Sequence, residues 1–101
     1  MSKRPTLTDV GRTTDGRTVI GGFFVLVAAH GVPLEVIVEQ SERRGYALDW
    51  FGFWCEAMRE GWNPGSCVTR VANAIGEVRG QAAREHAEAI LGRISRYWEP
   101  A

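Results

Sequence analysis

The spacing of apolar residues predicts helices over most of the second half of the chain. Residues 33–44, 66–79 and 81–98 each repeat apolar or small side chains at the i, i+3, i+4 and i+7 positions. This is the period of an amphipathic helix. Gly45 and Gly80 stand just after two of these segments, where glycine in a left-handed conformation often ends a helix. We therefore expect three amphipathic helices here.

Residues 50–60 show a different pattern, because they are apolar around most of the helical circumference. At 100° per residue the apolar side chains cover an arc of about 200°, roughly twice the stripe of an ordinary surface helix. Asp49 is suited to cap the start of this helix, and Gly61 is placed to end it. Residues 46–62 also hold six of the ten aromatic residues of the chain. We expect a central helix that builds the core or a contact surface.

Residues 18–29 allow two interpretations. A hairpin turned at Gly21-Gly22 is favoured by the valines and phenylalanines, which have high strand propensity. A single buried helix is favoured by Leu26, by the two alanines and by Gly31 at its end. We prefer the helix, because an isolated two-stranded hairpin has marginal stability.

The first 17 residues are expected to form a mobile basic arm. Residues 1–14 show neither helical nor strand periodicity, and Asp15-Gly16 is a turn signal. The connections between the remaining segments are short, which is typical of neighbouring helices. The predicted fold is therefore all-α: a small compact bundle of four to five short helices in a single domain, residues 18–101, preceded by the arm.

Composition narrows the class of protein without identifying it. The 101 residues carry no net formal charge, although residues 1–17 have a net charge of +2. A dedicated nucleic-acid binder usually has a stronger positive bias. The longest apolar run, residues 19–29, is shorter than the ~20 residues that span a bilayer. With two cysteines and no apolar secretory signal in the first 17 residues, a cytoplasmic protein without membrane partners is expected.

The wide apolar arc of residues 50–60 raises the question of what covers it. Neighbouring helices can enclose it as part of the core, or part of it can stay exposed and bind another protein. The core and interface interpretations differ at four residues on its margin: Phe51, Cys55, Met58 and Trp62. Such residue types are enriched at protein interfaces. A protein partner is expected, a second copy in a homodimer included.

Binding to DNA is an alternative, because residues 33–44 and 49–60 are two short helices in succession. The second of them presents Trp, Phe and Met, which are not the side chains that usually contact base edges. The helix after Ser66 is better suited, together with cations of the arm. The candidate nucleic-acid residues are Arg12, Arg17, Thr69, Arg70 and Asn73.

No motif indicates a metal, a cofactor or catalysis. Cys55, Cys67, His30 and His86 match no short zinc-ligand spacing, and a Cys–His nucleophilic pair among them has no support beyond chance. We therefore expect no enzyme and no cofactor. The expected function is that of a small regulator, inhibitor or adaptor that binds protein, of the kind encoded by a phage or mobile element. A structural subunit of a larger assembly is a third hypothesis.

Overall fold

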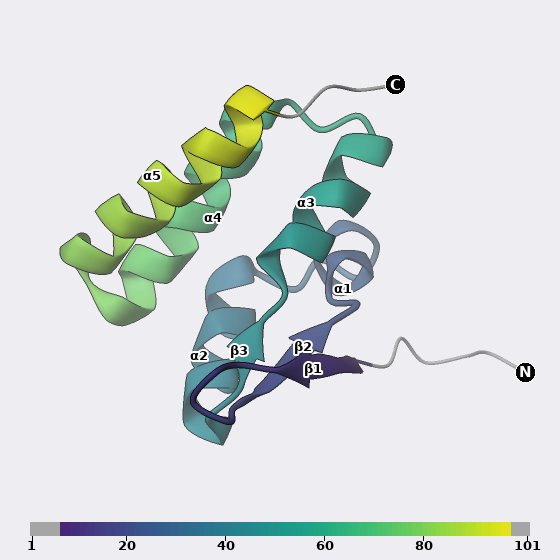
Figure 1. Ribbon diagram of the computed structural model, residues 1–101. Helices are drawn as coiled ribbons and strands as arrows, with labels where there is room; N and C mark the ends of the chain where they lie inside the picture. The colour runs from purple at the N-terminus through teal and green to yellow at the C-terminus, as the bar shows by residue number, and fades with distance from the viewer. Residues whose placement is uncertain (1–6, 98–101) are drawn as a thin grey trace, which may run out of the picture.

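The computed structural model describes residues 7–97, which form five helices and a three-stranded sheet (Figure 1). The expectation of an all-α bundle is wrong, because the fold is mostly helical α+β. Residues 1–6, which include Lys3 and Arg4 of the expected arm, lie outside the described residues, as does Trp98 of the last expected helix. The sheet was missed because its strands are short, because the first strand is irregular, and because the third pairs with a strand far away in the sequence.

The sheet has the strand order β1-β2-β3. Strand β1 (Thr8–Arg12) and strand β2 (Thr18–Gly21) form an antiparallel hairpin. Strand β3 (Ala47–Leu48) runs parallel to β2 on its other side. Residues 8–12 are therefore a strand and not a mobile arm. A β-bulge between Asp9 and Gly11 makes β1 irregular, so no alternating pattern marks it in the sequence.

Residues 18–29 form neither the single helix nor the hairpin that was expected. The first part is β2, and the second part is the short helix α1 (Phe24–Ala28). Gly22 separates them with φ of +77°, a conformation that glycine adopts without steric cost. β2 forms because it pairs on both sides, which a local comparison of propensities cannot detect.

Helix α2 (Leu34–Arg44) begins one residue later than expected, with Pro33 at the N-cap position. It ends at Gly45 in the left-handed conformation, as predicted. The predicted ion pair between Glu39 and Arg43 is present, with 3.0 Å between its charged atoms. The chain then turns directly into β3, so a strand separates α2 from the next helix.

Helix α3 (Trp50–Arg59) follows β3 and lies next to α1 (Figure 1). The predicted N-cap is confirmed, because the Asp49 side chain accepts a hydrogen bond of 3.0 Å from the Gly52 backbone N–H. The backbone N–H of Asp49 donates to the carbonyl of Ile20 in β2. Asp49 therefore ties the start of α3 to the sheet.

Helices α4 (Pro64–Arg79) and α5 (Gln81–Tyr97) run side by side in opposite directions (Figure 1). The expected start of α4 after Ser66 is wrong. Asn63 is the N-cap and accepts a hydrogen bond from the Ser66 N–H, and Pro64 fits the first turn because it needs no hydrogen-bond acceptor there. The two helices approach closely at Gly76, where an added Cβ would lie 2.9 Å from Cβ of Arg84.

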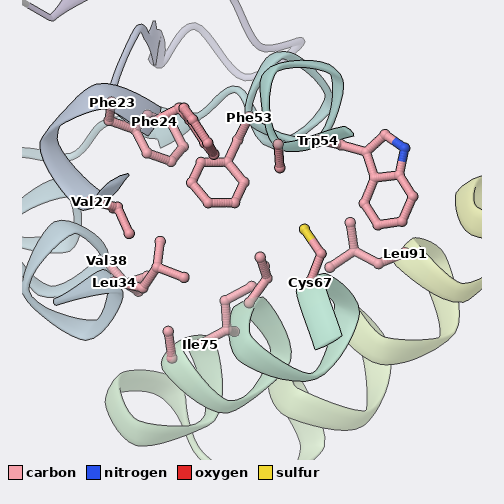
Figure 2. Close-up of a cluster of buried hydrophobic side chains, with 13 residues drawn as sticks. Phe23, Phe24, Val27, Leu34, Val38, Phe53, Trp54, Cys67, Ile75 and Leu91 are labelled. Carbon is pink, nitrogen blue, oxygen red and sulfur yellow. The ribbon is translucent and has the colours of Figure 1, made fainter. Parts of the chain in front are cut away.

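The hydrophobic core lies between α3 and the other four helices (Figure 2). Phe53 points from α3 toward Phe23 and Phe24, while Trp54 lies on the side of Leu91 of α5 (Figure 2). Helix α2 contributes Leu34 and Val38 to the same cluster. Side chains from all five helices thus contribute to one core, which is why the short sheet can remain at its edge.

None of the helices formed by residues 7–97 combines the length and apolarity needed to cross a membrane.

Candidate interaction surface

The inner face of α3 is fully covered by other elements. Phe53 and Trp54 are 3% and 1% exposed, and Ala57 is completely buried. The Phe53 ring stacks on Phe23 and meets Phe24 edge-on, with 5.3 Å between ring centroids in each case. These are favourable aromatic geometries that add to the apolar burial. This part of the aromatic segment is core, in agreement with the first of the two interpretations.

The outer margin of α3 is not covered in the same way. Phe51 is 60% exposed, which makes it the most exposed large apolar side chain among residues 7–97. Cys55 and Met58 follow at the i+4 and i+7 positions and are half-buried. Residues at this spacing lie on one side of a helix. We call Phe51, Cys55 and Met58 the α3 outer face.

Trp62 does not belong to the α3 outer face, although we predicted it from the sequence as part of the same set of interface residues. Its ring packs against Phe24 and Phe53, at centroid distances of 5.1 and 5.8 Å. The guanidinium carbon of Arg70 lies 4.4 Å from the Trp62 ring centroid, within the range of a cation–π interaction. Trp62 is thus half-buried at the edge of the core, and a role for it in binding a partner stays a prediction.

The two cysteines differ in environment, and both are free thiols. Cys67 is completely buried in α4, and burial raises the pKa of its thiol to about 11. A thiol with such a pKa is almost entirely protonated at neutral pH and reacts slowly. Cys55 is half-buried on the α3 outer face.

Among residues 7–97, no three His, Cys, Asp or Glu side chains converge to hold a metal ion.

The cations of the N-terminal hairpin are engaged by neighbouring carboxylates. Arg12 donates to both carboxylate oxygens of Asp9 at 2.9 Å, and Arg17 donates to Asp15 at 3.2 Å. The Arg12 hydrogen bond lowers the pKa of Asp9, and hydrogen bonds from Thr13 and Arg17 lower the pKa of Asp15. Both arginines are therefore partly neutralised, which reduces what they can contribute to phosphate binding.

The other nucleic-acid candidates lie on α4. Thr69, Arg70 and Asn73 are all exposed, but Asn73 accepts a hydrogen bond of 3.0 Å from Arg84. Arg70 and Asn73 also share a depression with two carboxylates, Glu35 and Glu77, which oppose a phosphate backbone. The expected helix–turn–helix unit is interrupted by β3. DNA binding stays a prediction, with weaker support than the sequence suggested.

A second apolar surface was missed by the sequence analysis. It is a cleft of about 280 Å³ between α2 and the sheet, which we call the α2 cleft. Val36, on the α2 side of its mouth, is 41% exposed. The available signal was that Val36 lies outside the apolar stripe of α2. The cleft itself depends on strands that the sequence did not reveal.

No protein-family model matches the chain, and no curated protein or solved structure is significantly similar to it.

Proposed function

We propose that this protein is a small non-catalytic regulator, inhibitor or adaptor that acts by binding another protein through the α3 outer face. The observation that carries the proposal is the 60% exposure of Phe51 on a helix whose opposite face is fully buried. A phenyl ring that is mostly exposed contributes little to the stability of the monomer. Aromatic and methionine side chains are enriched where proteins meet.

A second copy of the chain is the first partner to consider. In a dimer with two-fold symmetry, the same surface is used by both subunits. If two α3 helices cross antiparallel near Cys55, Phe51 of one subunit meets the region of Met58 in the other. This arrangement pairs an aromatic ring with a thioether, a favourable contact in its own right. The free thiols fit a reducing compartment such as the cytoplasm.

Affinity capture with matched variants tests the proposal. The tagged wild-type chain is compared with Phe51→Glu and with Val25→Glu, which places the same charge at another exposed apolar position, 38% exposed on α1. We expect a specific partner, a second copy included, that is retained by wild type and Val25→Glu and lost with Phe51→Glu. A partner that binds all three chains equally would contradict the assignment of the α3 outer face.

The DNA-binding hypothesis predicts a complex that weakens steeply as salt increases. A mobility-shift titration at low salt is its test, with Arg70→Gln as the variant. The absence of any shift would remove this hypothesis.

The hypothesis of a structural subunit predicts assemblies larger than a dimer, which light scattering over a concentration series would detect.

A further inference from the structure

The two sides of α2 are packed very differently. Leu34 and Val38 face the core and are almost completely buried. The opposite side stands over the sheet and leaves the α2 cleft between them. The apolar walls of the cleft come from α2, from the sheet and from the residues next to them: Leu7, Ile20, Val32, Val36, Ile37 and Leu48. A cleft of about 280 Å³ lies just below the range of roughly 300–1,000 Å³ that is usual for small-molecule sites.

Four polar residues line the α2 cleft among residues 7–97. The hydroxyl of Ser41 donates to the Val38 carbonyl at 2.7 Å and is therefore already satisfied. Gln40, Arg44 and Tyr46 complete the lining. Arg44 is the only charged residue in it, and no carboxylate lines the cleft within the part of the chain that the structure describes. The one formal charge that the described residues place in the lining is therefore positive.

Arg44 has no ion-pair partner among residues 7–97, in contrast to two other arginines on or beside α2. Its neighbour Arg43 pairs with Glu39 at 3.0 Å, and Arg79 pairs with Glu42 at 2.9 Å. An arginine at the rim of an apolar cleft, with no carboxylate of its own chain, is available to a carboxylate from outside. Guanidinium groups bind carboxylates with favourable two-pronged geometry.

We propose that the α2 cleft binds a small molecule with an apolar body and one carboxylate, such as a short aliphatic acid. The apolar body would occupy the walls, and the carboxylate would meet Arg44, with Gln40 and Tyr46 as further hydrogen-bond donors. This inference is independent of the α3 outer face, since no α3 residue lines the cleft within residues 7–97.

Octanoate is the probe that tests the proposal, with 1-octanol as a neutral molecule of the same chain length. Binding is followed by the backbone amide signals of the full chain in an NMR titration. We expect saturable octanoate binding with a Kd on the order of 0.1–1 mM. The largest shifts are expected at Val36, Gln40 and Leu48, and octanol is expected to bind more weakly.

Two pairs of variants test separately whether octanoate binding depends on the charge of Arg44 and whether it takes place in the α2 cleft. Arg44→Gln is expected to weaken octanoate binding about 3- to 10-fold and to leave octanol unchanged, whereas Arg43→Gln leaves both unchanged. Val36→Glu places a negative charge at the mouth and should abolish octanoate binding, while Val25→Glu, at a similarly exposed position outside the cleft, should not. Thermal unfolding of each variant verifies that it folds.

Several results would overturn the proposal. They are the absence of saturable shifts, octanol binding as tightly as octanoate, and shifts centred away from the α2 cleft. Concentration-dependent shifts at Val36 and Leu48 without any ligand would instead show that a second copy of the chain occupies the cleft. Loss of octanoate binding in Arg44→Gln and Arg43→Gln alike would also contradict the role given to Arg44.

Discussion

The inner and outer sides of α3 have similar apolar composition and opposite environments. The inner side meets Phe23 and Phe24 from the α1 segment and is almost inaccessible to solvent. On the outer side, Phe51 is 60% exposed. The difference arises because α1 and α4 cover one side of α3 and neither extends around it. Apolar residues therefore identify the helix surfaces that are suited to burial. The arrangement of the elements determines which of these surfaces are covered within the same chain.

The two cysteines offer the sharpest contrast between covered and uncovered positions. Cys67 is completely buried, so a thiol reagent reaches it only when the protein unfolds globally. With an unfolding free energy of about 5 kcal/mol or more, its modification should be at least about 1,000-fold slower than that of an unprotected thiol. Cys55 should react on a far shorter time scale. Single-cysteine variants, Cys55→Ser and Cys67→Ser, assign the two rates, and equal rates would contradict the described packing.

Truncation of one phenyl ring on each side of α3 should separate core from surface. Phe53→Ala removes a ring in contact with several aromatic neighbours and should lower the free energy of unfolding by about 3–5 kcal/mol. Phe51→Ala should change it by no more than about 0.5 kcal/mol. Urea unfolding at low protein concentration measures both values. Comparable losses for the two variants would show that Phe51 is part of the core.

Burial of Cys67 also predicts a dependence of stability on pH. Its thiol pKa is about 11 in the folded chain, raised from 9.0, so the folded state resists ionisation. The contribution of the protonated thiol to the free energy of unfolding is fully present below about pH 9. It is lost as the pH rises toward 11, by at most about 1.4 kcal/mol per pH unit. Urea unfolding across this range should show a smaller loss for Cys67→Ala than for wild type. An identical pH dependence would contradict the raised pKa.

Two helical glycines extend the same comparison to α4 and α5. A Cβ at Gly76 would lie 2.9 Å from Arg84, whereas a Cβ at Gly92 would have no atom within 4 Å among residues 7–97, apart from its chain neighbours and the nearby backbone of its own helix. Gly92→Ala should stabilise the protein by about 0.5–1 kcal/mol, because alanine is the better helix former. Gly76→Ala should lose this gain to overpacking and destabilise by about 1 kcal/mol. Thermal unfolding compares the two, and equal gains would contradict the close contact of α4 with α5.

Local patterns predicted α2, α3, α4 and α5 with bounds within a few residues, but they misassigned residues 18–29 and did not reveal the sheet. Asp49, Gly45 and Gly80 marked helix boundaries through capping chemistry that depends only on nearby residues. β3 has two residues, and β1 contains a bulge, so neither carries a periodic signal. Their pairing with β2 depends on the rest of the fold. Register and pairing between such strands are set by tertiary contacts that propensity scales do not contain.

The candidate site was predictable only in part for the same reason. The sequence placed Phe51, Cys55 and Met58 on the margin of α3, where the core and interface interpretations differ. It could not predict that Trp62 would turn back onto Phe24, since that contact joins residues far apart in the chain. Nor could it predict the α2 cleft, because two of its walls belong to the sheet.

Sedimentation equilibrium from about 1 μM to 1 mM is the most direct test of the central claim, that the α3 outer face is a contact surface first used by a second copy. We expect a reversible dimer for wild type and Val25→Glu, and a monomer for Phe51→Glu at every concentration. A wild-type chain that stays monomeric throughout, or a Phe51→Glu chain that dimerises as wild type does, would contradict the claim.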